Sequence, residues 1–334
     1  MARPSPRHPV RSRLVLGLIV ALLLLWLGEV GLRIAGIGPA YDAGSIAGWR
    51  TAASLGTREL KGPRDKHGFK VTTNADGLRT SYTRARTAKA RVAIMGDSTV
   101  FGWGVDDGGT VADGLEASLT ARGYDVEVLN AGQPGYSTVQ AAWLFRESVA
   151  AYKPDLVITF LPLHDHNLVL VSDAETLRGG VGAAAAARVL MAQHSRIYAV
   201  LRGWLFRESA RAFILPNMAD GEPRVPRVSD EERAEALSSI ASIQAVDGHQ
   251  LGVGLLPFLG DLTGAVANRV GVDWLKTWAE AENRPFFDAR RCCGSAAGHL
   301  VLPDDPGHLT QEGNFAAAES LADAVVAALA SDPG

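Results

Sequence analysis

A chain of 334 residues, 47% of them hydrophobic, has enough apolar side chains for one large domain or two ordinary ones. The formal net charge is −3, and no run of lysine and arginine interleaved with aromatic residues occurs beyond the first residues, which argues against a nucleic-acid partner. The two cysteines, Cys292 and Cys293, are adjacent. Because neighbouring cysteines rarely reach good disulfide geometry, we expect no disulfide framework.

The first 37 residues combine a basic start with a long apolar run. An uncharged stretch extends from Leu14 to Gly28 after an arginine-rich tip that contains no acid. A cleaved signal peptide has the same basic start and apolar core, but here Glu29 and Arg33 follow the run and no convincing small-x-small cleavage site is present. We therefore expect an uncleaved single-pass anchor with its N-terminus in the cytoplasm and the rest of the chain outside; a cleaved signal and a soluble form are the alternatives.

Residues 38–90 are polar, charged and rich in glycine, and we expect a juxtamembrane segment there. Within it, Phe69, Val71 and Thr73 alternate with other residues just before the turn-forming sequence NADG. This pattern predicts a short hairpin that leads into the following domain.

Short apolar runs alternate with helical stretches from residue 91 to about residue 330. Strands are expected at Val92–Met95, Val126–Leu129, Leu156–Leu161, Gly252–Leu256 and Pro285–Phe287. Capping-box spacing predicts helix starts at Ser137 with Gln140 and at Ser229 with Glu232, and the last helix is expected to begin near Thr310. On one face of that helix we expect Phe315, Ala318, Ala322, Val325 and Leu329. The alternation predicts an α/β domain of three layers (α/β/α) with a central parallel sheet of about five strands.

Residues 169–227 break this pattern. They contain the sequence GGVGAAAAA and a helical stretch, RIYAVLRGWLF. We expect an insertion that covers one end of the sheet. The residues around Trp204 and Phe206 are interpreted as a packing face, or alternatively as a lid over an acyl chain.

Polar loops follow the predicted strands, and in a parallel sheet the carboxyl ends of the strands are where sites form. The loops are Gly96–Ser98, Asn130–Ser137, Pro162–Asn167 and Asp304–Gly313. Together they supply a hydroxyl, backbone donors at glycines, histidines and acids. This is the inventory of a serine hydrolase.

The loop sequences resemble the conserved blocks of the SGNH (GDSL) hydrolase family. MGDSTVFGWGV is similar to the first block, which implies that Ser98 is the nucleophile, and NAGQPGYS is similar to the second, which implies that the Gly135 N–H lines the oxyanion hole. DDPGH resembles the last block, Asp-x-x-His, and gives Asp305 and His308. The resemblance spans roughly residues 66–330 and implies a flavodoxin-like fold. FKVTTNADGLR and the apolar N-terminus resemble the anchored, extracytoplasmic branch.

The chemistry of these blocks agrees with the resemblance. A serine hydroxyl is a weak nucleophile and needs a base within hydrogen-bond reach. His308 fits that role, with Asp305 on the same tight turn to accept its other ring N–H. The backbone N–H groups of Ser98 and Gly135 would then stabilise the oxyanion formed on an ester carbonyl.

The third block departs from the family pattern, Gly-x-Asn-Asp. Alignment by the preceding strand places Pro162 at the glycine, His164 at the asparagine and Asp165 at the aspartate. A histidine N–H is able to donate a hydrogen bond, so we expect His164 to be the third oxyanion donor, with Asn167 as the alternative.

Simpler interpretations exist for the same residues. Ser98 is alternatively a helix N-cap, His308 a surface loop residue, and Asp97 a group that bonds the loop backbone. His164 and His166 would share a face in an extended segment and suggest a metal site with Asp165, but no other histidine has a suitable spacing. We therefore expect neither a metal nor a cofactor.

The main hypothesis is a membrane-anchored serine esterase that forms an acyl-serine, resolved by water or by an acceptor hydroxyl. The substrate would be an acylated small molecule, glycan or lipid of the cell envelope. A second hypothesis, motivated by the altered third block, is a catalytically impaired module of the same fold that binds a glycan or a partner. A flavodoxin-like nucleotide binder is weaker, because no phosphate-binding glycine loop stands in the required place.

Overall fold

The structure is a computed structural model that describes residues 9–35, 57–61, 68–160, 163–169, 172–178, 195–205, 225–248, 250–263, 271–290, 292–293, 297–303 and 305–331. The chain divides into two compact units, described separately below. The smaller unit comprises Met1–Asp42 and Gly182–Met218, and the larger one comprises Ala43–Val181 and Ala219–Gly334.

A five-stranded parallel sheet in the order β4-β3-β5-β8-β9 forms the centre of the larger unit. Its strands are β3 (Ala90–Gly96), β4 (Val126–Gly132), β5 (Leu156–Phe160), β8 (Gln250–Leu255) and β9 (Phe286–Asp288). The five predicted strands are all present. β4 runs beyond its apolar residues because the polar Asn130 pairs with Ile94 inside the sheet. In chain order this is the 2-1-3-4-5 arrangement of flavodoxin-like folds.

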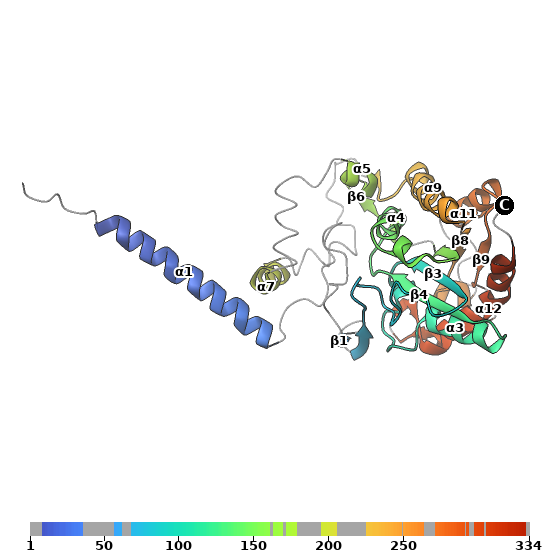
Figure 1. Cartoon of the computed structure of the whole chain (residues 1–334), viewed down its shortest axis with the longest axis horizontal. Coiled ribbons are helices and arrows are strands. Elements are labelled where there is room, and N and C mark those ends of the chain that lie inside the picture. The colour runs from blue at the N-terminus through green and yellow to red at the C-terminus, as the bar shows by residue number, and fades with distance from the viewer. Residues whose placement is uncertain are drawn as a thin grey trace, which may run out of the picture. The chain divides into compact units, whose positions relative to one another are not determined.

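Helices cover both faces of the sheet. Figure 1 shows α4 (Thr138–Glu147), α9 (Asp230–Asp247) and α11 (Val272–Ala281) on one side of the strands, and α3 (Val111–Ala121) and α12 (Gln311–Ala330) on the other. Alternate residues of β3 enter the two cores. Val92 and Ile94 pack with α3 and α12, whereas Ala93 and Met95 pack with α4 and α9. The predicted three-layer α/β/α architecture is therefore confirmed.

The remaining elements of the larger unit are short. They are β1 (Thr57–Lys61), β2 (Gly68–Thr72), α2 (Ser98–Phe101), η2 (Val149–Tyr152), η3 (Leu163–His166), β6 (Leu168–Val169), α5 (Asp173–Arg178), β7 (Val225–Pro226), α10 (Leu259–Thr263), η4 (Gly298–Leu300), β10 (Val301–Leu302) and β11 (Asp305–Leu309). Several of them carry the residues of the site described below.

The predicted helix starts are confirmed. Ser137 and Gln140 form a capping box at the start of α4, and Ser229 and Glu232 exchange the same pair of bonds at the start of α9. Thr310 caps α12 through its side chain. On α12, the predicted residues Ala318, Ala322 and Val325 are buried, while Phe315 and Leu329 are partly buried.

The hairpin before the domain differs from the prediction. β2 carries the expected buried residues Phe69 and Val71, but its antiparallel partner is β1, which precedes it. Asn74 accepts hydrogen bonds from the backbone N–H groups of Asp76 and Leu78, so the NADG sequence does turn. No strand follows within residues 73–89, because Leu78 is instead drawn into the core beneath α4.

A short strand pair joins the two ends of residues 169–227, for which the sequence predicts an insertion. β6 and β7 pair antiparallel, with Leu168 opposite Pro226 and Val169 opposite Val225. The predicted helical stretch is observed as α7 (Arg196–Leu205), which belongs to the smaller unit. The GGVGAAAAA sequence, Phe206 and the side chain of Trp204 lie outside the described residues.

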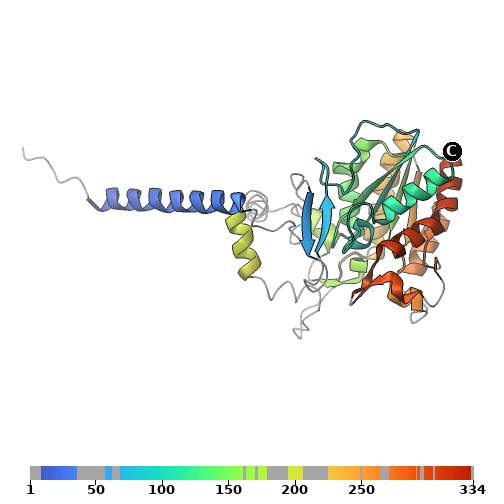
Figure 2. The same cartoon turned by 90° about the horizontal axis from the view of Figure 1, so that it is seen from below.

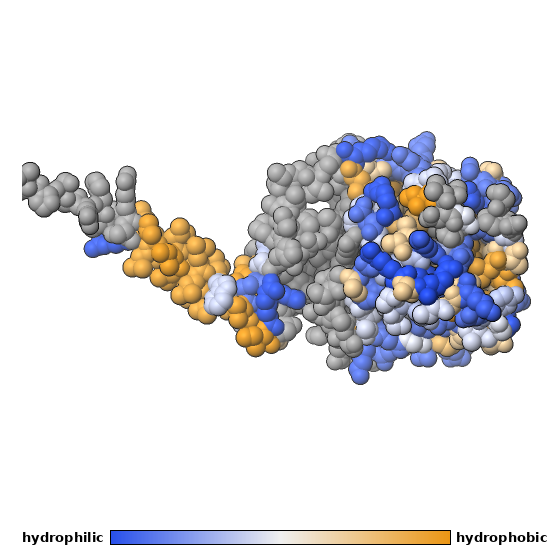
Figure 3. All heavy atoms as spheres, in the orientation of Figure 1, coloured by the Kyte–Doolittle hydropathy of each residue, from blue (hydrophilic) through white to orange (hydrophobic). Residues whose placement is uncertain are grey.

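The smaller unit contains α1 (Pro9–Ile34) and α7. Residues Arg13–Ile34 of α1 contain an 18-residue window with a mean hydropathy of 2.4 and are long and apolar enough to cross a membrane, a property that signal sequences share. The apolar side chains from Leu14 to Leu27 are exposed, and Figure 3 shows them as a continuous hydrophobic surface along the helix. The predicted apolar helix is therefore present.

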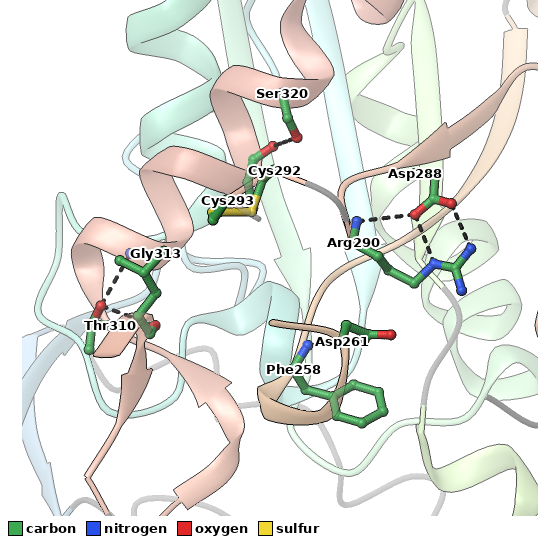
Figure 4. Close-up of a disulfide and its surroundings, with 11 residues drawn as sticks. Phe258, Asp261, Asp288, Arg290, Cys292, Cys293, Thr310, Gly313 and Ser320 are labelled. Carbon is green, nitrogen blue, oxygen red and sulfur yellow. Dashed lines mark hydrogen bonds and ion pairs between the residues drawn. A yellow bond between two sulfur atoms is a disulfide. The ribbon is translucent and has the colours of Figure 1, made fainter. Parts of the chain in front are cut away.

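The two adjacent cysteines are bonded to each other, a pairing that is rare between neighbours. Cys292 and Cys293 form a disulfide, with their Cα atoms 3.8 Å apart. The chain bends at these residues, and the N–H of Cys292 donates to the carbonyl of Ala289. Figure 4 shows the pair beside α12, close to Ser320. The disulfide closes no large loop and so forms no framework.

A buried ion pair joins the starts of β3 and β4 in the central sheet. Arg91 on β3 lies opposite Glu127 on β4, its Nε donates to Glu127 at 2.6 Å, and both side chains are almost fully buried. Burial opposes ionisation of Glu127, yet hydrogen bonds from Thr87 and the pairing with Arg91 outweigh burial and hold the pKa of Glu127 below its ordinary value.

Replacing Arg91 with methionine is expected to lower the free energy of unfolding by about 3–5 kcal/mol, because the carboxylate of Glu127 stays buried without its partner. The exposed Arg122, which pairs with Glu319, is the matched control, and Arg122→Met should cost about 1 kcal/mol or less. Urea unfolding followed by tryptophan fluorescence measures both. Equal losses of unfolding free energy in the two variants would contradict this account.

The pKa of Glu127 is lower in the folded state than in the unfolded state. The stability that Glu127 contributes to the fold is therefore present above its unfolded-state pKa and is lost as the pH falls through its folded-state pKa.

Candidate active site

The site-forming loops meet at the carboxyl ends of the central strands. Ser98 follows β3, the turn around Gly135 follows β4, and His164 follows β5. β3 and β5 are neighbours in the sheet although β4 lies between them in the chain. The carboxyl ends of these strands therefore form a topological switch point. β11 supplies the last two residues of the site.

Ser98, His308 and Asp305 form a hydrogen-bonded row. The carboxylate oxygen Oδ2 of Asp305 accepts from Nδ1 of His308 at 2.7 Å. The other ring nitrogen, Nε2, therefore accepts from the Ser98 hydroxyl, also at 2.7 Å. The structure thus brings together the three residues that the sequence singled out for catalysis, from segments 210 positions apart.

The helix-cap interpretation of Ser98 is excluded by its neighbour. Asp97 is the N-cap of α2, and its Oδ1 accepts from the Thr99 N–H at 2.9 Å and from the Thr99 hydroxyl at 2.8 Å. Ser98 is the first residue of the helix, and its hydroxyl is directed to His308 instead. Asp97 bonds the loop backbone, as predicted.

Close packing fixes α2 on the sheet. A Cβ atom on Gly132 would lie 2.3 Å from the backbone nitrogen of Phe101, so only glycine permits this approach of β4 to α2. The side chain of Asn130 donates to the Val100 carbonyl at 2.9 Å. Arg79, which is buried, donates to the Phe101 carbonyl at 2.9 Å. These contacts hold Ser98 in one position relative to the strands.

Asp305 and His308 lie on a strand, where the sequence predicted a tight turn. β11 pairs antiparallel with β10, with a bulge between Val301 and Leu302. Oδ1 of Asp305 accepts from the Gly307 N–H at 3.2 Å, which leaves Oδ2 for His308. Burial opposes ionisation of Asp305, but these hydrogen bonds outweigh burial and hold the pKa of Asp305 below its ordinary value.

Gly135 lies in a turn between Gln133 and Tyr136, closed by a 3.1 Å bond between their backbones. Its φ of 77° at the third turn position, after Pro134, is typical of a type II turn. Among the residues that the structure describes, the N–H groups of Gly135 and Ser98 donate to no other group. Within the described part of the chain, these two backbone donors at the ends of β3 and β4 are thus available to a ligand.

Arg227 holds the Gly135 turn in place from the base of the insertion. Its Nη1 donates to the Gly135 carbonyl at 2.9 Å, its Nη2 to Gln140 at 3.0 Å, and its Nε to Asp173 at 2.9 Å. Asp173 also accepts from the Ser137 hydroxyl at 2.6 Å. This buried network ties the insertion to the loop that carries Gly135.

His164 is partly buried in η3, and Asn167 bonds its ring. The amide Nδ2 of Asn167 lies 3.3 Å from Nδ1 of His164. Because the amide nitrogen only donates, Nδ1 accepts and the ring proton resides on Nε2. Burial lowers the pKa of His164, and the charge of Arg227 acts in the same direction, whereas the charges of Asp97 and Asp165 act against it. The ring is therefore held neutral with Nε2–H as a donor.

The carboxylate of Asp165 is occupied by hydrogen bonds that hold the fold together. It is fully buried and accepts from the Thr138 N–H at 2.9 Å, the Thr138 hydroxyl at 2.6 Å and Nε of Arg233 at 2.9 Å. The segment is a 3-10 helix and not extended, so the condition under which His164 and His166 would share a face is not met. Within the described part of the chain, no three His, Cys, Asp or Glu side chains are grouped to hold a metal ion. Pro162 lies outside the described residues.

Sequence reasoning missed the buried arginines that support the site, namely Arg79, Arg227 and Arg233. Arginine is rarely buried unless it is paired, and the partners of these residues lie far along the chain. No local pattern distinguishes them from surface arginines.

Comparison with known proteins identifies one family. The family model described as GDSL-like Lipase/Acylhydrolase matches residues 94–315. No curated protein matches the chain. Among solved structures, the chain is similar to LAE5, an alpha/beta hydrolase enzyme from the metagenome of Lake Arreo, Spain, at 20% identity over 73% of this chain and 96% of that one, with a TM-score of 0.45.

Two further structures are similar to the chain. The psychrotrophic esterase EstA from Pseudoalteromonas sp. is 11% identical over 72% of this chain and 98% of that one, with a TM-score of 0.45. A lipolytic protein of the G-D-S-L family from Desulfitobacterium hafniense DCB-2 is 14% identical over 71% and 99%, with a TM-score of 0.42.

Proposed function

Because the chain belongs to the GDSL-like lipase/acylhydrolase family, we propose that it is a serine hydrolase of carboxylic esters with a Ser98–His308–Asp305 catalytic triad. The observation that carries the proposal is the hydrogen-bonded row of these three side chains, with both of its bonds 2.7 Å long. We take the catalytic domain to span residues 91–330, with residues 169–227 as its insertion.

The reaction follows from the geometry of the row. His308 accepts the Ser98 proton at Nε2 as Oγ attacks the ester carbonyl, and Asp305 stabilises the imidazolium through Nδ1–H. His308 then gives the proton to the departing alcohol, which leaves an acyl-serine. Water, or the hydroxyl of an acceptor, attacks the acyl-serine after losing its proton to His308, and Ser98 is restored. Water would give hydrolysis and the acceptor would give acyl transfer.

Three donors are assigned to the oxyanion hole: the Ser98 N–H, the Gly135 N–H and the Nε2–H of His164. The two backbone groups have no other acceptor among the described residues. His164 stands where the family has asparagine, and Asn167 acts through it by holding the tautomer that carries the Nε2 proton. In this proposal His164 is the oxyanion donor and Asn167 orients it, so the two residues act together and are not alternatives.

Removing the imidazole in His164→Ala is expected to lower kcat by about 10²–10³-fold with little change in KM, because the donor acts on charge that develops in the transition state. His164→Asn, which restores an amide donor, should retain more activity than alanine. Steady-state kinetics on a short-chain chromogenic ester measure both. A wild-type kcat in His164→Ala would remove His164 from the oxyanion hole. If the wild type is inert and His164→Asn is active, the chain is the impaired binding module instead.

We place the catalytic domain outside the cytoplasm, tethered by α1 as an uncleaved single-pass anchor. The length and apolar surface of Arg13–Ile34 support this topology. Substrates in reach of such an enzyme are acylated glycans or lipids of the cell envelope. Labelling of Ser98 in intact cells by a membrane-impermeant fluorophosphonate tests both the nucleophile and the topology.

A further inference from the structure

The end of α1 binds the start of α7. Glu29 is the only acid in α1, and its carboxylate accepts from the backbone N–H groups of Arg196 at 2.8 Å and Ile197 at 3.1 Å. It also accepts from the Ser195 hydroxyl at 3.2 Å and from Nε of Arg33 at 2.9 Å. Glu29 therefore caps a helix that lies about 165 residues further along the chain, satisfying donors that helix starts leave unpaired.

Apolar packing adds to this contact. A Cβ atom on Gly28 would lie 3.2 Å from Cδ1 of Ile197, so the glycine lets the isoleucine approach α1 closely. Val200 and Leu201 follow Ile197 at three- and four-residue spacing on the same face of α7 and are 38% and 51% exposed. An apolar stripe thus begins on α1 and continues, uncovered, along α7.

The orientation and charge of α7 suit a membrane surface. Figure 2 shows α7 running across the end of α1 rather than alongside it. If α1 crosses the bilayer, α7 then lies along its surface. The sequence of α7 contains Arg196 and Arg202 and no acid, which favours contact with lipid phosphates.

The depth of Glu29 agrees with this placement. Glu29 follows Arg13, the first residue of the apolar span, by sixteen positions, or about 24 Å of helix at 1.5 Å per residue. The hydrocarbon core is about 30 Å thick, so Glu29 and the bound end of α7 lie near its outer boundary. Interfacial helices bury their apolar face about 5–10 Å into this boundary. The capping bonds and Arg33 pair a carboxylate that would otherwise be costly at this depth.

We propose that α7 is an interfacial helix that lies on the outer leaflet of the bilayer crossed by α1, held there by Glu29. This inference rests on the anchoring proposed above. It makes α1 a retained part of the mature protein, because a segment removed as a signal peptide cannot cap α7. It also means that the insertion contacts lipid at a second point, in addition to the anchor.

Photo-crosslinking tests the proposal on the full-length chain in nanodiscs of phosphatidylcholine and phosphatidylglycerol. A diazirine amino acid is placed at Leu201, at Leu22 on the exposed surface of α1, or at Ser242, which is exposed on α9. Mass spectrometry is expected to find lipid adducts at positions 201 and 22 and none at 242. Lipid adducts at position 22 without adducts at position 201 would overturn the interfacial position of α7 and leave the anchoring by α1 intact. Absence at both positions would overturn the anchoring and this inference with it.

The variant Glu29→Leu separates the capping of α7 by Glu29 from the insertion of α1 into the membrane. It extends the apolar run, so lipid adducts at position 22 should persist, while adducts at 201 decrease and the amides of Arg196 and Ile197 lose protection from hydrogen exchange. Glu29→Gln, which keeps one acceptor oxygen, should retain part of this protection. Unchanged adducts and protection at α7 in Glu29→Leu would contradict the role of Glu29. Hydrolysis of a soluble short-chain ester should be unaffected, because Glu29 takes no part in the triad.

Discussion

Replacing Ser98 with alanine is expected to reduce kcat for a short-chain chromogenic ester by roughly 10⁶-fold, the loss seen when the nucleophile of such a triad is removed. The variant loses the only atom that forms the acyl intermediate and the partner of His308 at 2.7 Å. Its fold should persist, because Asp97 and not Ser98 caps α2. Esterase assays and labelling by a fluorophosphonate probe measure the effect.

The control for this experiment is another serine. Ser239 lies on α9, where its hydroxyl bonds the Ala236 carbonyl, and Ser239→Ala should keep both the activity and the labelling of the wild type. Circular dichroism checks that Ser98→Ala is folded. If the folded alanine variant is labelled as strongly as the wild type, Ser98 is not the nucleophile.

The second large effect is expected at Asp305, where asparagine should lower kcat by about 10⁴-fold. The amide can donate to Nδ1 of His308, which then accepts and leaves the proton on Nε2. A protonated Nε2 is unable to take the proton of Ser98. Steady-state kinetics measure the loss. Fluorophosphonate labelling should slow in parallel, because it needs the same activated hydroxyl.

Stability measurements separate this catalytic loss from misfolding. The pKa of Asp305 is lowered in the folded state, so its contribution to stability is present above the unfolded-state pKa and is lost as the pH falls through the folded-state value. The difference in unfolding free energy between wild type and Asp305→Asn should therefore shrink in acid. A kcat near that of the wild type at neutral pH would show that Asp305 does not orient the base.

Much of the fold follows from local patterns. The strands are short apolar runs buried on both faces, and the helix starts at Ser137, Ser229 and Thr310 carry their own capping side chains, so both are visible within a few residues. The partner of β2 is not visible in this way. β1 reads TRELK, a polar segment without alternation, and only its antiparallel register with β2 makes it a strand.

The site was predictable where its groups follow strand ends, because parallel strands bring their carboxyl ends together. This applies to Ser98, Gly135 and His164. The roles proposed for His164 and Asn167 depend on a contact between their side chains at a 3-10 helix, and the sequence pattern does not show this helix. The hydrogen bond from Arg227 to the Gly135 carbonyl joins residues 92 positions apart, and the periodicity of apolar residues does not predict such pairs.

The strand pair β6–β7 and the hydrogen bond from Arg227 to Gly135 have a consequence for the sequence between them. The pairing of Val169 with Val225 joins the two ends of residues 169–227 to each other, and Arg227 bonds this junction to the Gly135 carbonyl. These two contacts fix where residues 169 and 225–227 lie relative to the Gly135 turn. A change in the sequence between them that keeps both contacts is therefore expected to leave Gly135 in place.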